Sequence, residues 1–154
     1  MATAQTSFDR AEEACLTFLG TIFGWSAGDD GDISRDDWID PTLVNKAVFG
    51  MSGGPEQNQN YGVLVPAQAW YSYGNFIAQF ETRQDAIIAL GKIQNGFPAR
   101  RENGSPGITP HVRNFEMMEH PEITSVVVTE ENGSQYRVFT LRARFRVVYS
   151  NATE

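Results

Sequence analysis

The sequence predicts an α+β fold, with a mixed or antiparallel sheet, a helix packed on one face of it, and extra helices near the N-terminus. Three observations predict this class: apolar residues with helical spacing in two stretches, strand-like alternation in several others, and their order along the chain. The chain has 154 residues, of which 41% are hydrophobic and 12% aromatic. This is enough apolar material for one core, so we expect a single α+β domain over 1–154.

The first predicted element is an amphipathic helix near the N-terminus. Thr6 or Ser7 can cap it, and Gly24 and Gly28 end it. Apolar residues recur between these ends at spacings of three and four: Phe8, Ala11, Cys15, Phe18, Leu19, Ile22 and Phe23. Because Cys15 falls in this apolar stripe, we expect a buried core residue rather than a nucleophile.

The next stretch, GDDGDISRDDW (28–38), holds five aspartates and raises the question of calcium. With Gly31 at the sixth position of a helix-loop-helix calcium loop, oxygen ligands fall at positions 5, 7, 9 and 12: Asp30, Asp32, Ser34 and Asp37. Positions 1 and 3 are Ser26 and Gly28, so two carboxylates are missing. We therefore expect no metal site, only a solvated acidic turn between the first helix and a short second helix in TLVNKAVFGM.

Two loops and one long strand are predicted in the middle of the chain. The polar stretch SGGPEQNQN (52–60) and the proline-rich PARRENGSPGITP (98–110) have loop composition, and we expect both to be mobile. Between them, GVLVP and AWYSYGNFIAQFE have strand patterns. Both sides of the second strand are largely apolar or aromatic, so we expect it to be covered on each face or to meet a neighbour.

The clearest helix is RQDAIIALGKIQNGF. Thr82 followed by Asp85 resembles a capping box at its start, and Gly96 and Pro98 close it. The residues of its apolar stripe should lie on the sheet: Ala86, Ala89, Leu90, Ile93 and Phe97.

The last third predicts a hairpin, in which ITSVVVTE and QYRVFTLRARFRVVY flank the Asn132-Gly133 turn. In the final strand one alternating set predicts a core face: Phe139, Leu141, Ala143, Phe145, Val147 and Tyr149. The opposite face carries three successive arginines, here called the arginine row: Arg142, Arg144 and Arg146. In a chain of net charge −7, this row needs an anionic partner from the same sheet, another subunit or a phosphate.

Charge and motifs disfavour several function classes. The acidic balance opposes non-specific nucleic-acid binding, and no apolar stretch or signal-like N-terminus indicates a membrane or secretion. His111 and His120 match no metal spacing, one cysteine gives no zinc set, and no glycine-rich loop predicts a nucleotide cradle. We therefore expect no catalytic residue, no cofactor and no metal.

Two segments carry a family resemblance: FIAQFETRQDAIIALGKIQNGF, a strand running into a capped helix, and HPEITSVVVTEENGSQYRVFTLRARFRVVY, the closing hairpin. In this order of elements the chain resembles the tail terminator (tail completion) proteins of tailed bacteriophages. The resemblance implies a structural virion protein, assembled in the host cytoplasm. It would form a hexameric ring that caps the tail tube, contacts the tail tube protein and the neck or connector proteins, and lets DNA cross its lumen without specific binding.

Two other interpretations stay open. One is a nuclear-transport-factor-like α+β domain that binds a ligand or acts as an enzyme, and the other is a head-tail connector or neck subunit. In a ring, we expect the arginine row to pair with the aspartates of the acidic turn in the next copy: Asp29, Asp30, Asp32, Asp36 and Asp37. Arg100 and Arg101 are further candidate interface residues, because they lie on the second predicted loop.

Overall fold

The computed structural model describes residues 7–28, 31–36, 38–52, 57–61, 67–97, 112–118 and 121–150. Within them the elements follow in the order α1 (Ser7–Phe23), β1 (Ile33–Arg35), β2 (Lys46–Met51), β3 (Gln57–Tyr61), β4 (Ala67–Phe80), α2 (Arg83–Gly96), β5 (Val112–Met117), β6 (Glu122–Thr129) and β7 (Gln135–Ser150). The predicted α+β class is confirmed.

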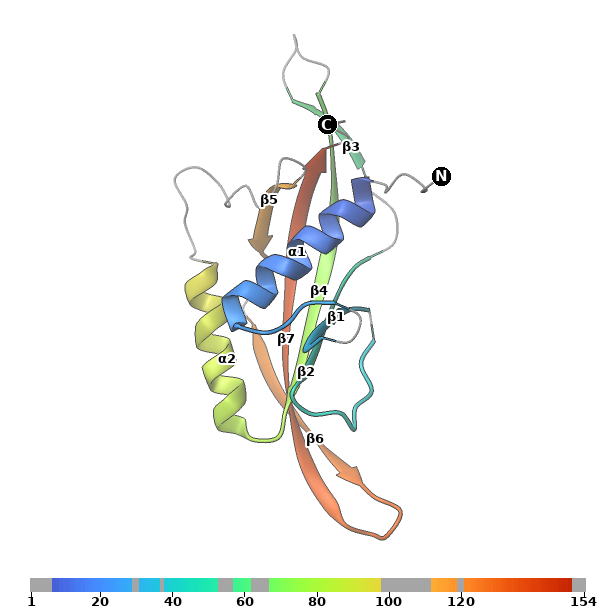
Figure 1. Ribbon diagram of the computed structural model, residues 1–154, viewed down its shortest axis with the longest axis vertical. Helices are drawn as coiled ribbons and strands as arrows, with labels where there is room; N and C mark the ends of the chain where they lie inside the picture. The colour runs from blue at the N-terminus through green and yellow to red at the C-terminus, as the bar shows by residue number, and fades with distance from the viewer. Residues whose placement is uncertain are drawn as a thin grey trace.

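All strands belong to one mixed sheet, built around the long pair β4 and β7 (Figure 1). The register of this antiparallel pair runs from Ala69 opposite Ser150 to Phe80 opposite Phe139. On one side β2 and β3 pair with β4, and on the other β5 and β6 pair with β7. Among the described strands, the short edge strand β1 alone is parallel to its neighbour, β2. The sheet is therefore narrow and long, with a hairpin extending at each end.

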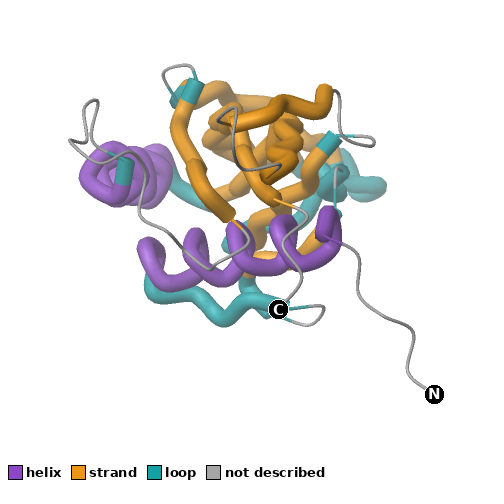
Figure 2. Tube along the Cα trace, turned by 90° about the horizontal axis from the view of Figure 1, so that it is seen from above, coloured by secondary structure: helices purple, strands orange, loops and turns teal. Residues whose placement is uncertain are grey.

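Both helices lie against one face of the sheet (Figure 2). In α1 the predicted stripe is confirmed, because Ala11, Cys15 and Leu19 are fully buried. Gly24 ends that helix with φ of +73°, a conformation that glycine adopts without steric cost. In α2 the predicted cap is also confirmed, since the Thr82 hydroxyl accepts a hydrogen bond from the Asp85 amide at 3.1 Å.

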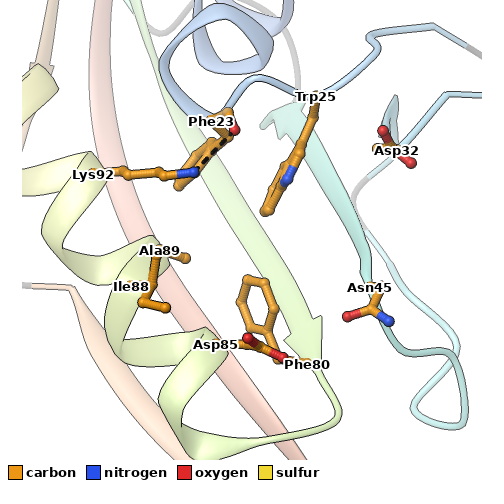
Figure 3. A pocket seen from close by; sticks show the side chains of 9 residues that line it. All are labelled: Phe23, Trp25, Asp32, Asn45, Phe80, Asp85, Ile88, Ala89 and Lys92. Atoms are coloured by element: carbon orange, nitrogen blue, oxygen red, sulfur yellow. Dashed lines mark hydrogen bonds between the residues drawn. The ribbon is translucent and has the colours of Figure 1, made fainter.

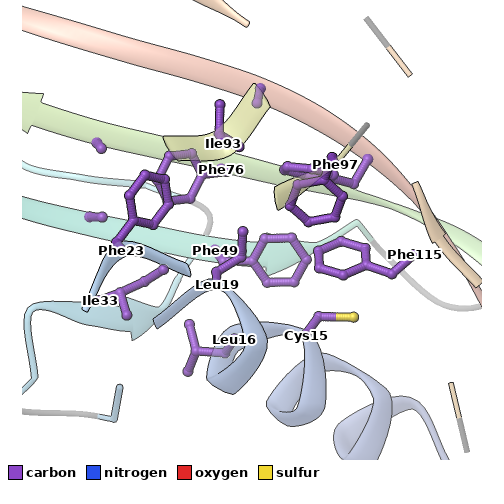
Figure 4. Packing of buried hydrophobic residues seen from close by; sticks show 14 of the residues in the cluster. Cys15, Leu16, Leu19, Phe23, Ile33, Phe49, Phe76, Ile93, Phe97 and Phe115 are labelled. Carbon is purple, nitrogen blue, oxygen red and sulfur yellow. The ribbon is translucent and has the colours of Figure 1, made fainter. Parts of the chain in front are cut away.

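The core between helices and sheet is dominated by aromatic rings (Figure 4). Phe115 from β5 and Phe145 from β7 lie with ring centroids 4.8 Å apart, and Phe97 at the end of α2 is 5.0 and 4.8 Å from these two. Phe49 of β2 joins them edge-on at 5.8 Å from Phe115. These edge-to-face and tilted ring pairs fill the space between the layers with apolar surface.

The predicted alternation of β7 is confirmed on its core face, where Leu141, Phe145 and Val147 are fully buried. The opposite face, here called the outer face, is only partly open to solvent. Thr140 on that face is 4% exposed. Near it, the Gln79 side-chain amide donates to the carbonyl oxygens of Asp40 and Leu43, both at 2.7 Å. The segment 40–43 therefore lies against part of the outer face.

Three sequence predictions are wrong or incomplete. The expected second helix in TLVNKAVFGM is absent, because Lys46–Met51 forms β2, whose pairing with β1 and β4 buries apolar residues on both faces and outweighs local propensity. The stretch expected to be an acidic turn contains β1 and is followed by β2 rather than by a second helix. The expected loop 52–60 contains β3, paired with β4, and β5 was not predicted. The expected loop 98–110 lies outside the described residues.

Candidate functional site

The arginine row lies on the outer face of β7, as predicted, and has partners within its own sheet. Arg146 is 3.7 Å from a carboxylate oxygen of Glu116 on β5. The guanidinium carbon of Arg144 lies 4.7 Å from the ring centroid of Tyr73 on β4, which is cation–π distance. Two of the three arginines therefore have a partner in the same sheet, one of the alternatives expected from the sequence. Pairing with another subunit stays a prediction.

The described aspartates of the acidic turn accept hydrogen bonds from residues nearby in the sequence. Asp32 Oδ2 accepts hydrogen bonds from the amide and hydroxyl of Ser26, both at 3.2 Å. Asp36 Oδ1 accepts from the Trp38 amide at 3.3 Å. The described residues contain no group of three or more His, Cys, Asp or Glu side chains placed to hold a metal ion. The other candidate interface residues, Asp29, Asp30, Asp37, Arg100 and Arg101, lie outside the described residues.

A buried carboxylate, not singled out by the sequence, connects α1 to two strands. Glu12 is 8% exposed, and its side chain accepts from Arg35 Nε at 2.6 Å and from the Met51 amide at 2.7 Å. Arg35 also donates to Asp9 at 3.0 Å. Burial lowers the pKa of Arg35, but its hydrogen bonds to Glu12 and Asp9 outweigh this and raise that pKa above its usual value. The cluster is a structural ion pair.

Two other titratable groups in the core are held neutral. Burial, helped by the charge of Glu12, raises the pKa of the Cys15 thiol well above its usual value, which agrees with a core residue. Burial raises the pKa of Tyr149 to about 12. Its hydroxyl has no hydrogen-bond partner among the described residues. At neutral pH neither group is ionised, so neither can act as a base or nucleophile without rearrangement.

An open cleft of about 350 Å³ lies where α1 ends, beside α2 and the end of β4 (Figure 3). Trp25 stands in its centre and stacks on Phe23 with a centroid distance of 4.4 Å and an interplanar angle of 16°. Phe80, the last residue of β4, lies 5.9 Å from Trp25. In Figure 3 the other face of the indole is turned toward Asn45. Phe23 and Phe80 are buried and Trp25 is half-buried, so Trp25 supplies the exposed part of this aromatic wall.

Polar groups surround this aromatic wall. Asp32 and Asp85 are exposed carboxylates that line the cleft. Lys92 Nζ donates to the Phe23 carbonyl at 3.4 Å, at the C-terminal end of α1. Because helix C-termini carry partial negative charge, this end adds to the two carboxylates. The arrangement suits a ligand with an apolar part and a cationic part.

Sequence reasoning missed this cleft because its residues come from separate parts of the chain. One signal was present: Asp85, Ala89 and Lys92 recur at helical spacing, which places them on one side of α2. Nothing local indicated that Trp25 would face them. That arrangement follows from the packing of the end of α1 beside α2 and β4.

No protein-family model matches this chain, and no curated protein sequence matches it. Neither described helix has the length and apolar character needed to cross a membrane.

Proposed function

We propose that this protein is a structural virion subunit, a tail terminator whose copies form a ring that caps the tail tube and joins it to the head-neck connector. Two kinds of support lead to this proposal. The geometry supports self-assembly, and the resemblance in element order supports the place in a phage tail.

The observation that carries self-assembly is a projecting hairpin, here called the arm (residues 126–138). Strand β4 ends at Phe80, opposite Phe139, so the first residues of β7 pair only with β6. Figure 1 shows this part extending beyond the helices and the rest of the sheet. Val126 and Val127 point to opposite faces of the arm and are 50% and 47% exposed.

Such an arm calls for a partner on physical grounds. A two-stranded ribbon is only marginally stable in water, and the outer edge of a β-branched strand is a template for further association. In the arm this edge belongs to the run VVVT (126–129), which has no charged residue and no proline. Packing of the arm on a neighbouring copy would remove apolar surface from water.

The proposal also fits the charge. With 19 acidic and 12 basic residues, the chain repels phosphate on balance, which suits a ring whose lumen DNA crosses without sticking. We propose that the tail tube protein and the connector are its other partners.

The experiment is to measure the mass in solution by light scattering and to image the sample by negative-stain electron microscopy. We expect rings of about six copies, following the hexamer that the resemblance implies. A monomer at all concentrations would argue against the proposal. A neck or connector subunit would also form a ring, and is separated from a tail terminator by whether purified rings bind tail tubes or heads.

A ligand-binding domain is the second candidate, and the aromatic cleft is the observation that favours it. In that case Trp25 fluorescence should respond to a small cationic aromatic or aliphatic compound at micromolar concentration, and the protein should be monomeric.

A further inference from the structure

The face of the arm on the helix side combines an exposed apolar side chain with a cation. Val127 lies directly opposite Arg137 in the β6–β7 register, so both side chains project from the same face. Arg137 is exposed, and its Nη1 donates to Ser125 Oγ at 3.2 Å on that face. This hydrogen bond limits the freedom of the guanidinium group. The face therefore presents a β-branched side chain beside a positioned positive charge.

The aromatic cleft is complementary to this face in both respects. The half-buried Trp25 and Ile88, which is 48% exposed, supply apolar surface for a valine, and the indole also attracts a guanidinium group. The exposed carboxylates Asp32 and Asp85 outnumber the one cation, Lys92, which is hydrogen-bonded to a backbone carbonyl. The charge of the cleft therefore favours a positively charged binding partner.

We propose that the helix-side face of the arm docks in the aromatic cleft of a second copy of this chain, with Val127 against Trp25 and Ile88, and Arg137 beside Asp32 and Asp85. The inference rests on the proposed function, because it names the surface that receives the arm in the ring. The contact joins two different surfaces, so it is a head-to-tail contact. Such contacts generate closed rings when the rotation between copies closes.

Two features restrict how the arm can dock. It continues strand β7 past Phe139, the last residue paired with β4, so it points away from its own body and cannot fold back onto its own cleft without bending the sheet. Its turn carries Glu130 and Glu131, which the cleft carboxylates would repel. The arm therefore enters with its flank and not with its tip.

The test uses charge reversal on each side of the contact. Arg137→Glu places a carboxylate beside Asp32 and Asp85, and Asp85→Arg places a cation beside Arg137 of the arriving arm. Each variant alone should raise the dissociation constant between copies about tenfold or more, measured by analytical ultracentrifugation. An equimolar mixture of the two variants should assemble again, because every arm then meets a cleft of opposite charge. The double variant should assemble by itself.

Arg83→Glu is the matched control. It makes the same change in charge as Arg137→Glu, at an exposed residue of α2 about 160° around the helix from Asp85 at 100° per residue, and should leave assembly unchanged. Circular dichroism of each variant checks folding, and Arg137→Gln with Asp85→Asn gives a milder pair with a smaller loss.

The outcomes separate the inference from the proposed function. Rings of the wild type that persist in both reversal variants would overturn the docking mode and leave the ring intact. Loss of assembly without rescue in the mixture and the double variant would also overturn the pairing of these two surfaces. A wild-type protein that stays monomeric at all concentrations would overturn both proposals.

Discussion

Replacement of Glu12 by alanine tests whether the buried ion pair holds α1 onto the strands. The change removes the acceptor of Arg35 Nε and of the buried Met51 amide. Arg35 keeps its ion pair with Asp9, and its side chain is 33% exposed. The stability lost with the Glu12–Arg35 hydrogen bond should therefore lie near the low end of the range for a charge-assisted hydrogen bond, about 1.5–3 kcal/mol. The Met51 amide loses its partner, at a cost of about 1–3 kcal/mol. Together we expect a loss of about 3 kcal/mol.

Urea denaturation followed by circular dichroism measures this loss. Natural domains have about 5–15 kcal/mol of stability, so the variant should still fold and its transition midpoint should fall with an unchanged slope. Glu13→Ala is the control, because Glu13 is the exposed neighbour in the same helix and the change in charge is the same. Its cost should be within about 0.5 kcal/mol. If the two variants unfold at the same urea concentration, the buried ion pair does not stabilise the fold as argued.

Three further predictions concern the sheet. Gly74→Ala should lower the free energy of unfolding, measured by urea denaturation, by about 1–3 kcal/mol, because the added Cβ would lie 2.6 Å from Cε1 of Phe49. Gly91→Ala in α2 is the control: its Cβ meets no atom within 4 Å, so the change should raise the free energy of unfolding by about 0.5–1 kcal/mol. Equal effects of the two variants would contradict the packing. Since the pKa of Tyr149 is raised to about 12, the free energy of unfolding should fall as pH rises from about 10 to 12, because the unfolded tyrosine ionises there and the folded one does not. Tyr149→Phe should make this fall smaller when denaturation is measured at each pH. An unchanged slope of the free energy of unfolding against pH would refute the prediction. Replacing the arginine row by glutamines should leave the melting temperature nearly unchanged and weaken ring formation, as half-molar salt should; full assembly would assign the row to pairing inside the subunit.

The sequence predicted those elements whose signal is local. Helix α1, helix α2 with its cap, strand β4 and the β6–β7 hairpin each have a clear period or a turn signature within a few residues. The core face of β7 followed from alternation alone. Strands β1, β2, β3 and β5 were missed because they are short, and the places of β2 and β5 also depend on β4 and β7, which lie farther along the chain.

The candidate site was predictable only in part. Alternation placed the arginine row on one face of β7, but the partners Glu116 and Tyr73 come from other strands and could not be identified. The aromatic cleft was not predictable, because Trp25, Asp85 and Lys92 meet only after α1 and α2 have packed. The Glu12 and Arg35 pair was likewise hidden by its separation in sequence.

Because of how α1 packs, a newly synthesised chain can complete its fold only after the strands that cover this helix have been made. This helix is synthesised before every described strand, yet Phe8 packs edge-on at 6.3 Å from Tyr149 of β7, and Phe18 at 6.0 Å from Phe115 of β5. Both partners follow α1 by about a hundred residues or more of sequence. The apolar side of α1 therefore stays exposed or bound to a chaperone until β7 has emerged from the ribosome. A chain interrupted before β7 would keep this apolar surface uncovered, and exposed apolar surface of this kind favours aggregation.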